Sequence, residues 1–140
     1  MRYVCDAPGS KTWFRLETEA EAADESLTMH HAVEKFFRQE QAKAQRSFTP
    51  PSRSFIEQEI GLRAHLLRTM PLFLTLRDDE GKPLVTAMLP PGALDDRSFR
   101  PIIVGNGNGD PYGEHAEAIR ALADHFGLDL DRAHCYPYRR

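Results

Sequence analysis

The chain has 140 residues, of which 41% are hydrophobic and 28% are charged, and its formal net charge is −3. A chain of this size and composition can bury its own core, so we expect one domain over residues 1–140 with no cofactor or disulfide needed for folding. The negative charge argues against nucleic-acid binding, which usually needs clustered basic residues. No apolar run has the length of a membrane span or opens the chain like a signal peptide. We therefore expect a cytoplasmic protein without membrane contact, in which Cys5 and Cys135 are free thiols.

The first half of the chain predicts a hairpin followed by a long helix. Residues 2–6 and 12–17 read as strands on either side of a Pro-Gly turn. Thr18 and the glutamate three residues later match a capping box, and apolar side chains then recur at helical spacing as far as Phe37. The helix is expected to continue through the polar stretch 38–46. Because that stretch has no apolar face, it should run into solvent or meet a partner there.

Acidic residues gather around the start of this helix, at Glu17, Glu19, Glu21, Asp24 and Glu25. Negative charge is favourable near a helix N-terminus because of the helix dipole. We therefore attribute the acidic cluster to helix stabilisation and assign it no catalytic role.

A second helix is expected after Ser54, which begins another capping-box match. Ile56, Ile60 and Leu67 share one side of it, with further leucines beside them. Gly61 weakens the prediction because glycine costs about 1 kcal/mol inside a helix relative to alanine. Part of this segment could be extended instead.

The second half of the chain predicts strands and a last helix. Residues 72–77 alternate leucines onto one face and pair with residues 84–89 across a polar turn. Residues 99–104 form a further strand, which Pro101 assigns to a sheet edge or to a late start. Residues 133–138 could add a final short strand.

The last helix is expected to begin after Asp110, with Pro111 in its first turn, and to end at Gly127. Helices and hairpins are grouped along the chain and do not alternate strictly. The sequence therefore predicts an α+β fold, with a mostly antiparallel sheet of about five to six strands and two to three helices packed on one of its faces.

A glycine-rich loop precedes this helix. Its members are Gly105, Asn106, Gly107, Asn108 and Gly109. Backbone N–H groups between a strand and a helix can bind a small anion or a nucleotide phosphate. However, the spacing matches neither a dinucleotide-binding fingerprint nor a P-loop, and the carboxylate of Asp110 can occupy those donors itself. The alternative is a tight connection in which Asn and Gly adopt positive φ angles.

Histidines and thiols supply the other candidate groups. His30, His31 and Glu34 could offer two metal ligands from one helix face, but no third ligand is evident and we favour structural or surface roles. His115 could act as an acid or base near the glycine-rich loop, oriented by Glu114 or Asp110. His134 adjoins Cys135 in the chain and would point to the opposite side of a strand, so we expect structural cysteines.

No sequence motif identifies a family. We predict a non-enzymatic binding or interaction module that forms a homo-oligomer, because a long polar helix over 38–46 needs something packed on it. The alternative is a small-molecule enzyme, or an anion- or nucleotide-binding protein, that uses the loop Gly105–Gly109 and His115.

Overall fold

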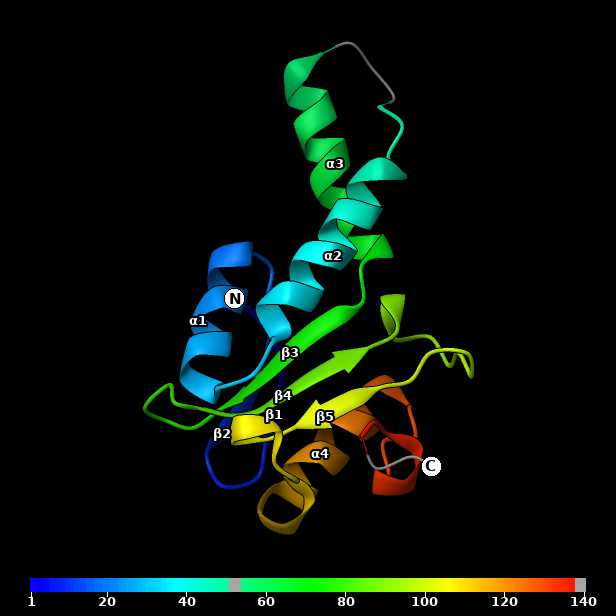
Figure 1. Cartoon of the computed structure of the whole chain (residues 1–140). Helices are drawn as coiled ribbons and strands as arrows, with labels where there is room; N and C mark the ends of the chain where they lie inside the picture. The colour runs from blue at the N-terminus through cyan, green and yellow to red at the C-terminus, as the bar shows by residue number, and fades with distance from the viewer. Residues whose placement is uncertain (51–53, 138–140) are drawn as a thin grey trace.

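The computed structural model describes residues 1–50 and 54–137, and Figure 1 shows their arrangement. The strands are β1 (Arg2–Ala7), β2 (Lys11–Arg15), β3 (Leu72–Arg77), β4 (Pro83–Leu89) and β5 (Ile102–Val104). The α-helices are α1 (Glu19–Met29), α2 (Val33–Arg46), α3 (Phe55–Thr69) and α4 (Tyr112–Phe126). The predicted α+β class is confirmed. Within the described ranges, no helix is long and apolar enough to cross a membrane.

The five strands form one antiparallel sheet in the order β1-β2-β3-β4-β5, which is also their order along the chain. The helices α1, α2 and α3 are inserted between the neighbouring strands β2 and β3. β5 lies at a sheet edge and starts one residue after Pro101, as the proline predicts. In place of a final strand, residues up to 137 form a 3₁₀ turn at Arg132–His134 and a single parallel bridge between Tyr136 and Ile102; residue 138 lies outside the described residues.

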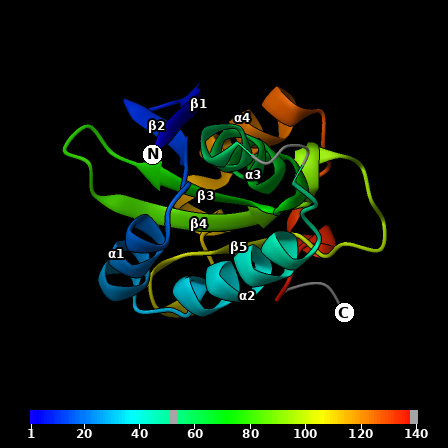
Figure 2. The same ribbon diagram turned by 90° about the horizontal axis from the view of Figure 1, so that it is seen from above.

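Helices cover both faces of the sheet, so the prediction of helices on one face is wrong. α4 packs on one face, where Leu74 and Leu76 of β3 join Leu122 in a buried cluster. α1 and α2 pack on the other face, where the rings of Phe37 and Phe73 lie 5.2 Å apart. Figure 2 looks down on this second face, with α4 behind the sheet. The reason is that β3 is apolar or buried at nearly every position, a pattern typical of strands enclosed on both sides.

Local signals fix the ends of α4. The carboxylate of Asp110 accepts a hydrogen bond from the N–H of Tyr112 at 3.0 Å, and Gly127 ends the helix in the left-handed region at φ 68°. The indole Nε1 of Trp13 donates to the carbonyl of Ala118 at 2.8 Å, which ties the middle of α4 to β2.

The single long helix predicted from Thr18 is in fact two helices. The capping box at Thr18 is present, but α1 ends at His30, whose φ of 55° is left-handed. α2 begins at Val33 in a new direction, and its Glu34 N–H donates to the hydroxyl of Ser26 at 2.8 Å. The break lets apolar side chains of both helices reach the sheet, and it depends on contacts between turns that sequence spacing does not reveal.

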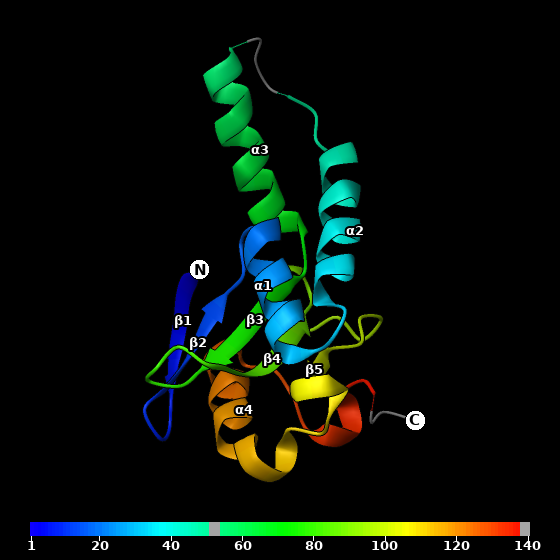
Figure 3. The same ribbon diagram turned by 60° about the vertical axis from the view of Figure 1, so that its left-hand side comes forward.

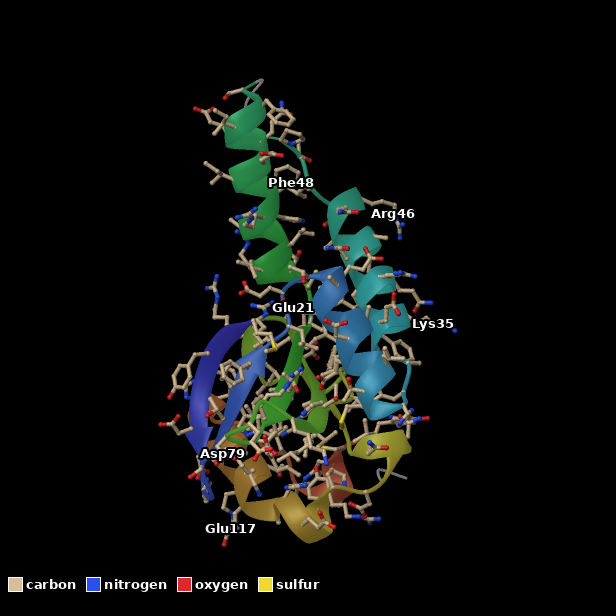
Figure 4. The ribbon with its side chains drawn as sticks, turned by 90° about the vertical axis from the view of Figure 1, so that its left-hand side faces the viewer. Glu21, Lys35, Arg46, Phe48, Asp79 and Glu117 are labelled. Carbon is tan, nitrogen blue, oxygen red and sulfur yellow. The ribbon has the colours of Figure 1, made fainter. Side chains whose placement is uncertain are left out.

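α2 and α3 form a helical hairpin that extends well beyond the sheet (Figures 1 and 3). Ala44 is buried between them, the Ser47 hydroxyl lies 2.8 Å from the His65 imidazole, and the Phe48 ring packs on the same imidazole. The polar stretch 38–46 therefore meets a partner within its own chain. Lys35 and Arg46 point away from α3 (Figure 4).

Candidate functional site

The glycine-rich loop forms a compact 3₁₀ turn that is closed by its own backbone. The Gly105 N–H donates to the Gly109 carbonyl at 2.7 Å, and the Gly109 N–H donates to the Asn106 carbonyl at 3.1 Å. Gly107 and Asn108 both have φ of 62°. These angles are the ones that a tight connection needs. Anion binding by this loop stays a prediction.

The carboxylate of Asp110, which follows the loop, already has partners within the chain. Its carboxylate accepts from the N–H of Tyr112 and pairs with Arg132 at 2.7 Å. Together these contacts, with the backbone hydrogen bond as the larger cause, lower the pKa of Asp110. The start of α4 thus carries its own anion next to the loop where a phosphate would bind.

His115 lies in the first turn of α4, beside the hairpin turn that joins β1 to β2. Its Nδ1 is 3.4 Å from the ammonium of Lys11, and its Nε2 is 3.7 Å from the carboxylate of Glu114. Burial, and secondarily Lys11, lower the pKa of His115. It borders a pocket of about 240 Å³, whose lining within the described residues includes no member of the Gly105–Gly109 loop. Among the described residues, this pocket holds His115 without the glycine-rich loop.

The three side chains predicted as candidate metal ligands point to different surroundings. His30 is exposed, His31 turns toward the sheet, and Glu34 pairs with Arg38 one turn further along α2. Of the residues that the structure describes, one group of potential ligands lies within 4.8 Å, and it consists of the exposed side chains of Asp129, Asp131 and His134. That group was not predicted from the sequence, and its His134 imidazole already lies 2.9 Å from the Asp129 carboxylate.

Both cysteines are free thiols. Cys5 is on β1, at one edge of the sheet, whereas Cys135 is fully buried near β5, at the other edge. Burial is the main cause that raises the pKa of each thiol, and Asp6 adds to the effect at Cys5. A raised thiol pKa is typical of an unreactive, structural cysteine.

One carboxylate of the acidic helix start is buried, contrary to the role in helix stabilisation expected of that cluster. Glu25 has 0% exposure and lies between α1 and the sheet. It accepts from the guanidinium of Arg77 at 2.7 Å and from the hydroxyls of Thr75 at 3.0 Å and Thr86 at 2.6 Å. A buried charge is tolerated when it is paired and hydrogen-bonded in this way. Glu25 follows Ala22, which is also buried, by three residues. This helical spacing was the feature of the sequence that could have indicated a core position.

The network continues from Thr86 to His31. The Nε2 of His31 lies 2.8 Å from the Thr86 hydroxyl, while the Val33 N–H points at Nδ1 from 3.4 Å. Because Thr86 gives its proton to Glu25, His31 donates from Nε2 and its Nδ1 is the acceptor. Burial lowers the pKa of His31, and Glu25 opposes that shift only in part. The imidazole is therefore neutral at physiological pH.

His31 and Thr86 form part of the wall of a pocket of about 330 Å³. The pocket lies between the start of α2 and the strands β4 and β5. Its wall is mainly apolar, with the rings of Phe36 and Phe73 and the side chain of Met88. This pocket, backed by the Glu25 network, is the candidate site that the tertiary structure assembles.

Comparison of the chain with models of protein families, with curated proteins and with solved structures finds no match.

Proposed function

We propose that this protein is a non-enzymatic interaction module that self-associates through α3. One observation carries the proposal: Phe55, Ile56 and Ile60 are 72%, 68% and 65% exposed on a single helix. Isolated exposed apolar side chains are common, but Ile56 and Ile60 lie four residues apart on one side of the helix, and a row of this kind is typical of an interaction surface. The group lies on the outer half of the helical hairpin, away from the core.

The exposed side of α3 has the pattern of a helix–helix interface. Leu66 packs on the cluster between α2 and the sheet, and His65 contacts the end of α2. Ile56 and Ile60 are four residues apart and lie opposite these contacts, in line with the half-buried Leu67. α3 therefore has two apolar sides, of which α2 covers one.

The charges on α3 favour a second copy of the same helix as the partner. Glu57 and Glu59 lie in its first half, and Arg63 and Arg68 lie in its second half. If two α3 helices pack antiparallel, the acidic half of each meets the basic half of the other, so Glu59 comes next to Arg63 of the second copy.

In this arrangement apolar residues also match. Ile56 of one copy faces Leu67 of the other, and Ile60 faces the small side chain of Ala64. Two helical hairpins then form a four-helix bundle around a two-fold axis, which is a common way for such hairpins to bury their second apolar side.

Sedimentation velocity of the full chain over a concentration series tests the proposal. We expect a reversible dimer that Ile60→Glu shifts to monomer. The matched control is Leu27→Glu, which places the same charge on another exposed helical leucine, on α1, and should leave the dimer intact. A wild-type chain that stays monomeric at the highest attainable concentration contradicts the proposal, as does equal loss of dimer in both variants.

A charge-reversal experiment tests the antiparallel arrangement. Arg63→Glu alone should weaken the dimer by placing Glu59 and a new glutamate next to each other. Adding Glu59→Arg should restore it, because the pair is then reversed and not lost. If the double variant is weaker than the single one, these two positions do not face each other.

The alternative predicted from sequence, an enzyme or anion-binding site at His115 and the glycine-rich loop, has weaker support. Glu114 and Glu117 line the same pocket as His115 and would repel an anionic ligand. Thermal stabilisation by inorganic phosphate or ATP, if lost in His115→Gln, would favour this alternative.

A further inference from the structure

We propose that the pocket between the start of α2 and strands β4 and β5 binds a small, uncharged, aromatic molecule. The proposal is independent of self-association, because the pocket lies at the sheet and the exposed face of α3 lies on the projecting hairpin. It rests on the size of the pocket, the chemistry of its wall and the way in which its His31 and Thr86 are already paired.

The size of the pocket suits a ligand of about two rings. Its volume is about 330 Å³. A cavity of about 150 Å³ is enough to hold benzene, so a bicyclic molecule fits with little empty space. Ligand pockets are commonly at least about 300 Å³, which places this one at the lower end of that class.

The wall favours an aromatic ligand. The rings of Phe36, Phe73 and Tyr136 line the pocket together with the thioether of Met88. Aromatic rings pack well edge-to-face on other rings, and sulfur makes favourable contacts with ring edges. Phe36 is 44% exposed even though it lines the pocket, so its ring has a free side that core packing leaves unused.

The polar groups of the wall favour an uncharged ligand. Thr86 donates to Glu25 and accepts from His31, and His31 is neutral. The charge of Glu25 lies behind Thr86 and is paired with Arg77. An ionised ligand would lose its water here without gaining a charged partner among the described residues of the wall, which is costly. A neutral ligand has no such penalty, and the Asn108 amide at the wall can hydrogen-bond a hydroxyl on it.

The buried network gives the pocket a fixed shape. Through Thr86 and Glu25 it connects His31, at the turn before α2, to β4 and to Arg77 on β3. His31 is therefore a positioning residue that holds one wall, and the pocket is formed before any ligand arrives. A preformed site binds more tightly because fewer groups must be ordered.

The test compares 1-naphthol, which is uncharged at neutral pH, with 1-naphthoate, which has the same rings and a negative charge. Binding is followed by ¹H–¹⁵N NMR of the full chain. We expect saturable shifts for the backbone amides of Val33, Thr86 and Val104, and binding of naphthoate that is weaker by roughly tenfold or more. Absence of shifts with naphthol, or equal binding of the two compounds, overturns the proposal.

Two variants locate the site. Val104→Phe fills the pocket and should abolish the shifts, whereas Lys35→Phe adds the same ring to the outward side of α2 and should leave them unchanged. If Val104→Phe does not fold, judged by circular dichroism, Phe36→Ala decides. Its partly exposed ring can be removed at small cost, and naphthol should then bind roughly three- to tenfold more weakly. Unchanged binding in a folded Val104→Phe, or in Phe36→Ala, also overturns the proposal.

Discussion

Replacing the Glu25 carboxylate with an amide probes the core of this molecule most directly. Glu25→Gln conserves shape and removes one charge. The Arg77 guanidinium, whose side chain is only 16% exposed, then loses the carboxylate that lies 2.7 Å away. Breaking a buried ion pair from one side costs about 3–5 kcal/mol. Because the amide oxygen can still accept from Arg77 and Thr75, we expect about 3 kcal/mol, which is a large fraction of the stability of a typical domain.

The amide also removes the hydrogen-bond acceptor of the Thr86 hydroxyl. In the native protein this hydroxyl accepts from His31 and donates to Glu25 at 2.6 Å. A glutamine that keeps its oxygen toward Arg77 must point its NH₂ group at Thr86, so the Thr86 hydroxyl proton loses its acceptor. The hydroxyl regains an acceptor if His31 moves its proton from Nε2 to Nδ1, because Nε2 can then accept from Thr86, but Nδ1 faces the N–H of Val33. The substitution should therefore change the His31 tautomer as well as the stability.

Urea unfolding of wild type and Glu25→Gln measures the free energy, and ¹⁵N NMR of the imidazole reports the tautomer. Glu80→Gln, in the exposed turn before β4, is the matched control and should stay within about 0.5 kcal/mol of wild type. In the double variant Glu25→Gln/Arg77→Gln the losses should not add, because the residues contact each other. A loss below about 1 kcal/mol with an unchanged His31 tautomer would refute the reasoning.

Three further outcomes follow from the buried groups. Folding lowers the pKa of His31 below its ordinary value of 6.5, so the unfolded chain binds a proton more readily than the folded one. The contribution of neutral His31 to the free energy of unfolding is therefore complete above pH 6.5 and decreases as the pH falls from 6.5 through the lower pKa of the folded state. Urea unfolding at a series of pH values can measure this decrease. Trp13→Phe removes the donor to Ala118 and should cost about 1–3 kcal/mol in the same assay. Cys135 should react with a thiol reagent more slowly than the partly exposed Cys5 at neutral pH, and denaturant should abolish the difference.

Signals that act over a few residues were sufficient to predict much of the fold. The capping box at Thr18, the carboxylate at Asp110 and the left-handed Gly127 each act within one helical turn. The alternation of residues 72–77 and their polar turn predicted the central hairpin, and Pro101 predicted the edge strand. In each case the physical cause lies in neighbouring residues, so it is visible in the sequence.

The side of α3 that remains exposed was not predictable in this way. Ile56 and Ile60 have the spacing of a buried stripe, yet α2 packs on the side that carries Leu66. Both sides of the helix are apolar, so burial depends on where α2 leads the chain. That direction is set at His30, where contacts of Ser26 with the start of α2 break the helix.

The sequence by itself determined the α+β class, the antiparallel sheet, the start of α1 and both ends of α4, because local conformational preferences and apolar periodicity require no knowledge of distant residues. Only the tertiary structure decided that both sheet faces are covered, that Glu25 is buried and that the pocket exists. Glu25 meets Arg77 and Thr86 from 52 and 61 residues away. The burial and pairing of a charge depend on such distant segments, since its energy is set by the groups that replace water around it.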